Sequence, residues 1–400
     1  MLTFASVFLV ALVGLLSVPI TLFFIEVLAS LYSVTEPSSD ISGLDKLKRA
    51  TVIVPAHNES VGIIPTIEDI KSQLGPRDRL IVVADNCSDD TGAIAAAAGA
   101  QVITRNDQTK IGKGYALGFG INHASLDPPD FVVFIDADCR IQADMIRRLK
   151  NACGKLRRPV QACFLMKSPE NSPIDHSLAE FAWIIKNWAR PLGMRYLNWP
   201  VQLMGTGMIF PWDVIRSAPL ASGDLVEDMK LGLHLAAIGK AAHFFPFVIG
   251  SSDFPTSNKG VESQRQRWVQ GHLGMIFRGV PRLLFQAVAR RNLELLVLTL
   301  DLAIPPLSLL GLLVIGTFLL ASVLCCFGAS PALILVAAAN LAAFALAILF
   351  AWLKFGRTIL PARALWSIGS LLLKRIWLYS QILMGRTATT WVRTDRSKSD

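Results

Sequence analysis

The sequence predicts an α/β domain with a mostly parallel sheet, flanked by transmembrane helices at both ends of the chain. Three observations predict this fold class. Between residues 50 and 274, short apolar runs alternate with helical stretches, as in sheets whose helices cover both faces. Residues 131–135, FVVFI, form an unbroken run of strand-forming residues that is typical of a central strand. Residues 1–25 and 303–353 contain no charged side chain, and one membrane span needs about 20 apolar residues.

The polar region is expected to form one domain over residues 45–275. Its predicted strands cover residues 51–54, 80–84, 101–104, 131–135 and 160–165. Its predicted helices cover residues 61–73, 91–98 and 113–124, and a helix-like run covers 229–237. Residues 177–188 repeat apolar side chains at helical spacing, and their aromatic residues suit either a membrane interface or a core helix.

Membrane segments account for a composition that is 52% hydrophobic and only 17% charged. We expect an N-terminal anchor at residues 1–33 and two transmembrane helices at 303–353, with a turn at 328–331. Residues 276–302 are expected to form an interfacial helical segment, and residues 354–400 an interfacial helix and a basic cytoplasmic tail. A cleaved signal peptide is the alternative for the first segment, but no basic residue precedes its apolar stretch.

Basic residues flank the predicted spans on one side. Lys46, Lys48 and Arg49 follow the first span, and Arg357 and Arg363 follow the last. The positive-inside rule therefore predicts a multi-pass protein of the cytoplasmic (inner) membrane whose polar domain is cytoplasmic. The formal charge of +9 is concentrated beside these segments, so we expect membrane lipids and nucleotide phosphates as partners, and no nucleic acid.

Asp136 and Asp138 directly follow the predicted strand 131–135. Open α/β sheets bind ligands beyond the carboxyl ends of their strands. Two carboxylates separated by one residue can hold a hard divalent cation, Mg²⁺ or Mn²⁺, against a diphosphate. Because Asp-x-Asp also occurs in ordinary turns after strands, this motif indicates a metal site only together with its neighbours.

Polar residues also follow other predicted strands. The first strand ends in a turn containing Pro55 and Glu59, which leads into a helix whose backbone donors can bind a phosphate. Asp85 ends the second strand and could accept a hydrogen bond from a base or a ribose. Lys113 begins the helix at 113–124, where it could lie beside a phosphate or be a solvated surface residue.

Two later segments carry further candidates. Gly205 and Thr206 begin a Gly-Thr-Gly segment, which fits either a close backbone approach to a ligand or a simple tight turn. Glu227 and Asp228 begin a helix-like run, and a carboxylate there can act as general base if it reaches an acceptor hydroxyl.

The sequence Gln264-x-x-Arg267-Trp268 combines a fixed cation with a large flat ring near an expected membrane junction. An arginine can neutralise a diphosphate, and a tryptophan can stack on a sugar ring. By itself, this segment is also compatible with an interfacial basic and aromatic helix.

In this order, the motifs resemble those of the membrane-integrated family 2 glycosyltransferases, which include cellulose, chitin and hyaluronan synthases. The resemblance covers nearly the whole chain. It rests on a first aspartate, an Asp-x-Asp, an acid pair and a Gln-x-x-Arg-Trp box, which are Asp85, Asp136, Asp138, Glu227, Asp228, Gln264, Arg267 and Trp268. It implies a GT-A fold, a nucleotide-diphosphate sugar donor, a divalent metal and inversion at the anomeric carbon.

The resemblance also implies roles for individual residues. Asp228 would deprotonate the acceptor, with Glu227 beside it, and Asp136 and Asp138 would hold Mg²⁺ or Mn²⁺. The implied donor-binding residues are Pro55, Glu59, Asp85, Lys113, Asp136, Gln264, Arg267 and Trp268. The implied acceptor-binding residues are Gly205, Thr206 and Trp268.

The chain looks like bacterial enzymes of the exopolysaccharide type. This implies sugar transfer, from a UDP-sugar donor, to a lipid-linked or growing glycan acceptor in envelope or exopolysaccharide synthesis, together with other polysaccharide-assembly proteins. Three alternatives remain: a noncatalytic nucleotide-sugar-binding subunit of a synthase or export complex, a polymer exporter, and direct transfer to polyprenyl phosphate. The retained acids argue against the first, and the Gln-x-x-Arg-Trp box argues against the last.

Overall fold

The computed structural model describes residues 2–36, 48–169, 174–255 and 258–383. In these residues the polar domain is built on an eight-stranded sheet in the order β3-β2-β1-β4-β7-β6-β8-β5. The strands are β1 (Ala50–Ala56), β2 (Arg79–Asp85), β3 (Gln101–Arg105), β4 (Phe131–Phe134), β5 (Arg140–Ile141), β6 (Val160–Lys167), β7 (Met208–Pro211) and β8 (His243–Asp253).

All five predicted strands are present, and the mostly parallel sheet is confirmed. β1, β2, β3 and β4 pair in parallel, as β6 and β8 do. β7 lies antiparallel between β4 and β6, and β5 pairs antiparallel with β8. These two strands and β8 are not among the strands predicted from the sequence. β5 and β7 are too short to show a period, and Pro246 interrupts the apolar pattern of β8.

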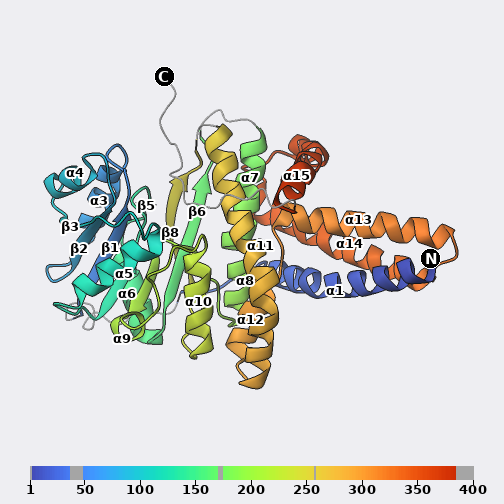
Figure 1. Ribbon diagram of the computed structural model, residues 1–400, viewed down its shortest axis with the longest axis horizontal. Helices are drawn as coiled ribbons and strands as arrows, with labels where there is room; N and C mark the ends of the chain where they lie inside the picture. The colour runs from blue at the N-terminus through green and yellow to red at the C-terminus, as the bar shows by residue number, and fades with distance from the viewer. Residues whose placement is uncertain (1, 37–47, 170–173, 256–257, 384–400) are drawn as a thin grey trace.

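Helices cover both faces of the sheet (Figure 1). They are α3 (Ile63–Lys71), α4 (Thr91–Ala97), α5 (Lys113–Ala124), α6 (Met145–Leu156), α9 (Trp212–Ile215) and α10 (Glu227–Ala237). Successive side chains of a strand point to opposite faces, so Val52 packs in one core with Ile67 of α3. Ile53 packs in the other core, with Leu117 of α5 and Leu235 of α10. The buried run of β1 is therefore that of a central strand.

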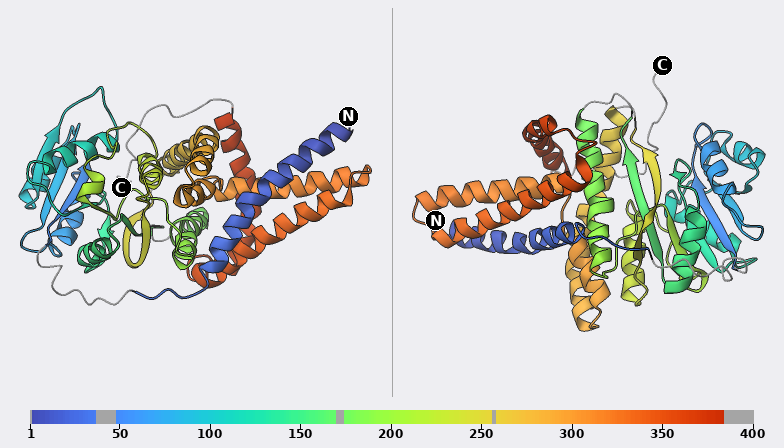
Figure 2. Two further views of the ribbon diagram at one scale, coloured as in Figure 1. Left: turned by 90° about the horizontal axis from the view of Figure 1, so that it is seen from below. Right: turned by 180° about the vertical axis from the view of Figure 1, so that it is seen from behind.

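A second helical layer separates the sheet from the long apolar helices (Figures 1 and 2). It consists of α7 (Ile174–Ile184), the π-helical segment η1 (Ile185–Ala189), α8 (Arg190–Tyr196), α11 (Asn258–Ala289) and α12 (Leu293–Leu302). Phe181 of α7 is buried against the apolar helices, so this stretch serves as a core helix. The expected boundary between residues 275 and 276 falls inside α11, which is one continuous helix.

The long apolar helices are α1 (Leu2–Ala29), α13 (Leu307–Cys326) and α14 (Pro331–Ala351). They project together from the domain, and the start of α1 lies near the α13–α14 turn at the far end (Figure 1). Residues 7–29, 307–326 and 331–356 are long and apolar enough to cross a membrane. α14 continues into η2 (Trp352–Gly356), η3 (Ala362–Ser367) and α15 (Ile368–Leu383), and the expected basic tail at 384–400 lies outside the described residues.

A buried ionic cluster joins α1 to the domain. Arg190 of α8 donates through Nε to Glu26 Oε2 of α1 at 2.6 Å, and through Nη2 to the Asp301 carboxylate of α12. Nearby, a Cβ on Gly193 would overlap the Glu26 carbonyl oxygen, so α8 and α1 cross in backbone contact. The cluster and this crossing fix the position of α1 against α8 and α12 of the second helical layer.

We expect Arg190→Leu to destabilise the protein by about 3–5 kcal/mol, because it leaves Glu26 and Asp301 buried without their cation. The measurement is the free energy of unfolding in detergent. Arg147→Ala is the control, since Arg147 pairs with Asp144 at the surface, with 49% and 60% of the two side chains exposed. That change should cost less than about 1 kcal/mol. Equal stability of the two variants would contradict a structural role for the cluster.

Candidate active site

A cavity of about 870 Å³ lies between the carboxyl ends of the parallel strands, the second helical layer and the apolar helices. Twelve of the thirteen predicted site residues line it; Thr206 does not. The twelve are Pro55, Glu59, Asp85, Lys113, Asp136, Asp138, Gly205, Glu227, Asp228, Gln264, Arg267 and Trp268. Motifs spread over more than 200 residues of the sequence therefore meet around one space.

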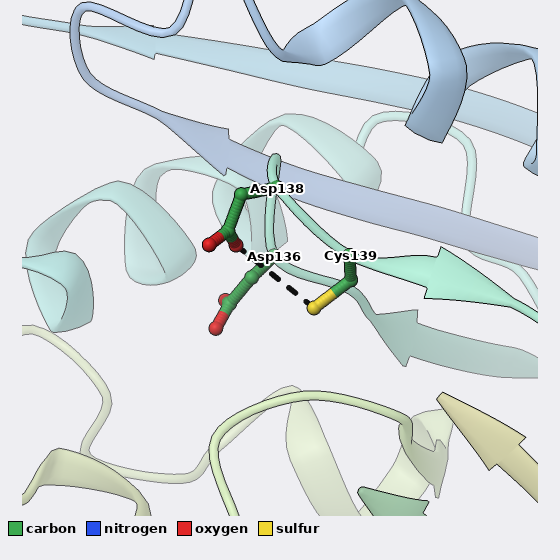
Figure 3. A group of neighbouring side chains, drawn as sticks. All are labelled: Asp136, Asp138 and Cys139. Carbon is green, nitrogen blue, oxygen red and sulfur yellow. Dashed lines mark hydrogen bonds between the residues drawn. The ribbon is translucent and has the colours of Figure 1, made fainter. Parts of the chain in front are cut away.

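The turn after β4 carries Asp136 and Asp138 into the cavity (Figure 3). Ligand atoms of these two residues and of Cys139 lie within 4.8 Å of one another. Ser252 Oγ of β8 donates to Asp138 Oδ2 at 2.9 Å. Burial raises the pKa of Cys139 to about 12, and its thiol donates to Asp138 Oδ1. The two carboxylates are therefore the residues that could hold a divalent cation, since Mg²⁺ and Mn²⁺ prefer oxygen ligands.

Thr206 lies behind this turn, with 1% of its surface exposed. Its hydroxyl oxygen accepts a hydrogen bond from the Asp136 backbone N–H at 3.0 Å. Gly205 and Gly207 have φ values of +87° and +66°, and this tight turn packs Thr206 against the Asp-x-Asp segment. The expected acceptor contact of Thr206 is therefore corrected, because the buried hydroxyl supports Asp136 instead.

We expect Thr206→Val to weaken Mn²⁺ binding roughly 5-fold, because the Asp136 N–H loses an acceptor worth about 1 kcal/mol. The Kd can be measured by electron paramagnetic resonance of free Mn²⁺. Thr206→Ser keeps the hydroxyl and should retain the affinity of the unaltered protein. Identical affinities for the valine and serine variants would exclude this supporting role.

Lys113, at the start of α5, lies among carboxylates. Its Nζ is 2.5 Å from Asp136 Oδ1 and 3.9 Å from Glu227 Oε1, and it donates to the Gly205 carbonyl at 2.8 Å. Burial opposes the charge, but the neighbouring carboxylates outweigh burial and raise the pKa of Lys113. The lysine is thus a charged group of the site and not a solvated surface residue.

Glu227 and Asp228 form the first turn of α10 and face the same cavity. A Cβ on Gly205 would lie 3.4 Å from both Asp228 Oδ2 and Lys113 Nζ, which shows how closely these groups approach. Burial raises the pKa of both acids, and the charge of Lys113 opposes the shift. A carboxylate with a raised pKa is a stronger proton acceptor once ionised, as a general base requires.

The Gln-x-x-Arg-Trp box lies in α11 and turns its three named residues, Gln264, Arg267 and Trp268, toward the cavity. Burial lowers the pKa of Arg267, although the Glu227 carboxylate favours the charged form. The ring of Trp268 packs on Trp183 of α7, with centroids 4.8 Å apart. α11 thereby brings a cation and an aromatic surface to the side of the cavity opposite the sheet.

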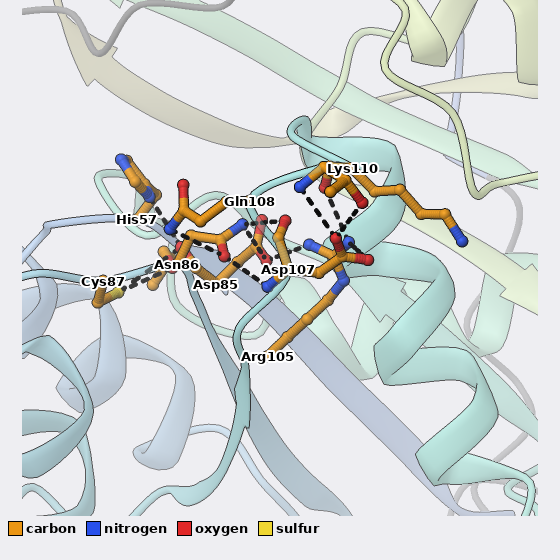
Figure 4. A network of polar contacts seen from close by, with 10 residues as sticks. His57, Asp85, Asn86, Cys87, Arg105, Asp107, Gln108 and Lys110 are labelled. Carbon is orange, nitrogen blue, oxygen red and sulfur yellow. Dashed lines mark hydrogen bonds and ion pairs between the residues drawn. The ribbon is translucent and has the colours of Figure 1, made fainter.

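Asp85, at the end of β2, belongs to a polar network (Figure 4). Arg105 Nη1 lies 2.5 Å from Asp85 Oδ1, and both side chains are buried. Burial raises the pKa of Asp85, and Arg105 opposes the shift. Arg105 also donates to the Lys110 carbonyl at 2.8 Å and lies over the Tyr115 ring. The network holds Asp85 in place at the edge of the cavity.

Arg105, Trp183, Lys186 and Ser252 are among the residues in or beside the site that were not predicted from the sequence. Arg105 directly follows the predicted strand 101–104, and a basic residue there could have been paired with Asp85. Lys186 is one of two charged residues, with Glu180, in the largely apolar and aromatic stretch 177–188, and Trp183 lies in the same stretch. Ser252 had no such indication, because β8 was not predicted.

Two protein families match the chain. The family described as Glycosyl transferase family 2 matches residues 51–209. The family described as Glycosyl transferase family group 2 matches residues 131–359, which is more than half of the chain. Together these matches include the sheet, the acid motifs, the Gln-x-x-Arg-Trp box and the helices α13 and α14.

Two curated relatives are also named as glycosyltransferases. The chain is 27% identical over 262 residues to "Probable glycosyltransferase YdaM" of Bacillus subtilis (strain 168), covering 59% of this chain and 58% of that one. It is 33% identical over 108 residues to 4,4'-diaponeurosporenoate glycosyltransferase of Staphylococcus aureus (strain USA300), covering 26% of this chain and 28% of that one. The matched part thus spans less than two thirds of either relative.

A solved structure has the same fold over nearly the full length. It is a mannosyltransferase from Pyrobaculum calidifontis in complex with GDP-Man and Mn²⁺, with a TM-score of 0.52 and 18% sequence identity. The likeness covers 94% of this chain and 96% of that one, and it confirms the expected GT-A fold. With more than half of its length matched by one family, the chain belongs to the family 2 glycosyltransferases.

Proposed function

We propose that this protein is a membrane-bound, metal-dependent, inverting glycosyltransferase. It moves a sugar from a nucleotide-diphosphate donor, a UDP-sugar in the first instance, to a lipid-linked or growing glycan acceptor in envelope or exopolysaccharide synthesis. One observation carries the proposal: the Asp-x-Asp, Lys113, the acid pair and Arg267 line a single cavity that continues to the apolar helices.

The donor's diphosphate is held at the sheet side of the cavity. Asp136 and Asp138 fit a Mg²⁺ or Mn²⁺ ion, because their hard carboxylate oxygens lie within 4.8 Å of each other, close enough for one ion to contact both. When bound, the ion neutralises charge on the leaving diphosphate. Lys113 adds a protein cation to the same region, Arg267 faces it from α11 across the cavity, and Asp85 lies where the nucleoside would extend. The Mn²⁺ and GDP-Man bound by the similar mannosyltransferase agree with this assignment.

The transfer itself is a single displacement. Asp228 accepts the proton of the acceptor hydroxyl, whose oxygen forms a bond to the anomeric carbon while the bond from that carbon to the diphosphate breaks. Attack from the face opposite the leaving group inverts the configuration. Fixed cations aimed at the departing diphosphate supply the largest share of catalysis, because charge develops there in a partly dry cavity.

The three long apolar helices cross the cytoplasmic membrane, and the catalytic domain faces the cytoplasm. The start of α1 and the α13–α14 turn lie at one end of the helical arm, as alternating spans require (Figure 1). Arg357 and Arg363 follow α14 at the end nearer the domain. This distribution of charge agrees with a cytoplasmic domain.

Catalysis is favoured over a noncatalytic sugar-binding subunit. A subunit that only binds a nucleotide sugar needs no acid pair buried beside the donor site, whereas Glu227 and Asp228 both line the cavity with pKa values raised by burial.

The test is release of nucleoside diphosphate by the protein in nanodiscs, supplied with a panel of UDP- and GDP-sugars. Each donor is assayed with Mn²⁺, with Mg²⁺ and with chelator, in the presence of bacterial membrane lipid extract and oligosaccharide fractions. We expect metal-dependent release from one donor and appearance of its sugar in an acceptor fraction. Donor binding without release in any fraction would refute the proposal in favour of the noncatalytic subunit.

A further inference from the structure

The cavity has two halves of different chemistry. Carboxylates and cations line the half at the sheet. The other half is lined mostly by residues of α1, α13 and α14, among them Phe23, Gly311, Ile315, Leu341, Phe344 and Ile348, and α15 adds Leu372, Arg375 and Tyr379. The two halves are continuous, so a molecule bound in the apolar half reaches the acid pair.

We propose that the acceptor is an amphipathic lipid, an inference that rests on the proposed function. Its hydrocarbon chain occupies the apolar half of the cavity, and its hydroxyl-bearing head group lies between Lys186 and Asp228. This assigns the acceptor class that the family membership leaves open between lipid and glycan.

The apolar half does not suit a glycan. Every sugar ring carries hydroxyls that need hydrogen-bond partners when they leave water. Three polar groups at this end have partners within the protein: the Ser308 and Tyr379 hydroxyls lie 2.7 Å apart, and Trp352 Nε1 donates to the Leu360 carbonyl at 2.8 Å. A hydrocarbon chain makes no such demand, and each buried methylene contributes about 0.8 kcal/mol.

The neck between the two halves supplies a group for the head of the lipid. Three charged or polar residues that line it already have partners. Arg190 and Asp301 form an ion pair with each other, and His272 Nε2 lies 3.0 Å from the Leu302 carbonyl oxygen. Lys186 also lines it, and its side chain is exposed there, over the ring of Trp183. Within the described residues, no hydrogen bond or ion pair to its ammonium is present, so it can donate to a head group beside Asp228.

The chain site is tested with hexadecanol that carries a photoreactive diazirine near the end of its chain. The protein in nanodiscs is irradiated with this probe, and labelled peptides are mapped by mass spectrometry. We expect labels on Ile315 and Leu341, which line the cavity. A tetrasaccharide with the same diazirine should leave them unlabelled.

Gly311→Leu is the blocking variant, since a Cβ there would already lie 3.4 Å from the Phe344 ring and the leucine would fill the cavity. Gly316→Leu is its matched control on the same helix, because a Cβ there meets nothing within 4 Å. Labelling of the cavity positions should fall at least 5-fold in Gly311→Leu and stay unchanged in Gly316→Leu. Ala345→Leu, at another cavity position, should repeat the loss.

Lys186→Gln tests the head-group end. A hydrogen bond to a charged donor is worth about 1.5–3 kcal/mol, so KM for the lipid acceptor should rise roughly 10-fold or more while KM for the donor stays unchanged. Lys155→Gln, at an exposed position of α6, is the control and should change neither constant.

Unlabelled cavity positions, or equal labelling in Gly311→Leu, Ala345→Leu and the unaltered protein, would overturn the lipid assignment. Mn²⁺-dependent binding of UDP and GDP, measured on the same samples, separates this failure from that of the proposed function. Nucleotide binding without cavity labelling refutes the lipid acceptor alone. Cavity labelling without nucleotide binding refutes the proposed glycosyl transfer and leaves the lipid site in place.

Discussion

Asp228→Asn is expected to lower the rate of sugar transfer about 10²–10⁴-fold while donor affinity stays unchanged. Asparagine keeps the size of the side chain and its oxygen can still accept from the Met229 N–H, but the amide cannot take the acceptor's proton. Single-turnover transfer measures the loss, and calorimetry with the nucleotide and Mn²⁺ measures the affinity. Asp213→Asn, at an exposed position of α9, is the control and should transfer normally. Undiminished transfer by Asp228→Asn would rule out Asp228 as the base.

The same assignment fixes the direction of the pH dependence. Burial raises the pKa of Asp228 above its ordinary value of about 4, and a general base works only when it is deprotonated. Transfer should therefore be lost as the pH falls through this raised pKa, at a higher pH than an exposed aspartate would give.

Asp138→Ala is expected to remove metal-dependent donor binding and, with it, transfer. The change deletes one of the two carboxylates placed to hold the cation and leaves the Ser252 hydroxyl without its acceptor. We expect the Kd of the nucleotide in Mn²⁺ to rise by about 100-fold or more, toward the value of the unaltered protein in chelator. Calorimetric titration with UDP or GDP, whichever matches the donor, measures this.

A graded series sharpens this expectation. Ser252→Ala removes only the hydrogen bond that orients Asp138 and should weaken metal affinity by about 10–100-fold. Asp144→Ala removes a carboxylate that is 60% exposed and should have no effect. Metal-dependent binding that survives in Asp138→Ala would show that Asp138 is not a ligand.

Much of the fold could be predicted because its information is local. The run at 131–135 indicates a strand buried on both faces, and helix α5 begins and ends where its pattern does. Parallel strands of one sheet have their carboxyl ends at the same edge. Asp85 and Asp136, which follow two such strands, could therefore be predicted to lie at one edge without any knowledge of the packing. β7 was not predicted, since its place between β4 and β6 depends on pairing across about 75 residues.

The site shows the same division. The acid motifs, the Gln-x-x-Arg-Trp box and the polar turns between predicted elements were enough to identify twelve residues that line one cavity. They could not show that Thr206 supports Asp136, that Arg105 pairs with Asp85, or that Lys186 is exposed at the neck. Each of these features depends on how segments far apart in the sequence pack together, and no periodic pattern in the sequence records that packing.

By itself, the sequence determined the class of fold, the apolar helices, the family and twelve residues that line the cavity, because periodicity, motif order and charge are readable along the chain. Only the tertiary structure decided that Arg190 binds α1 and α12 together and that the polar half of the cavity continues among the apolar helices. The physical reason is that a cavity and a buried ion pair are properties of packing. They depend on which surfaces of distant helices meet, and no local pattern encodes that meeting.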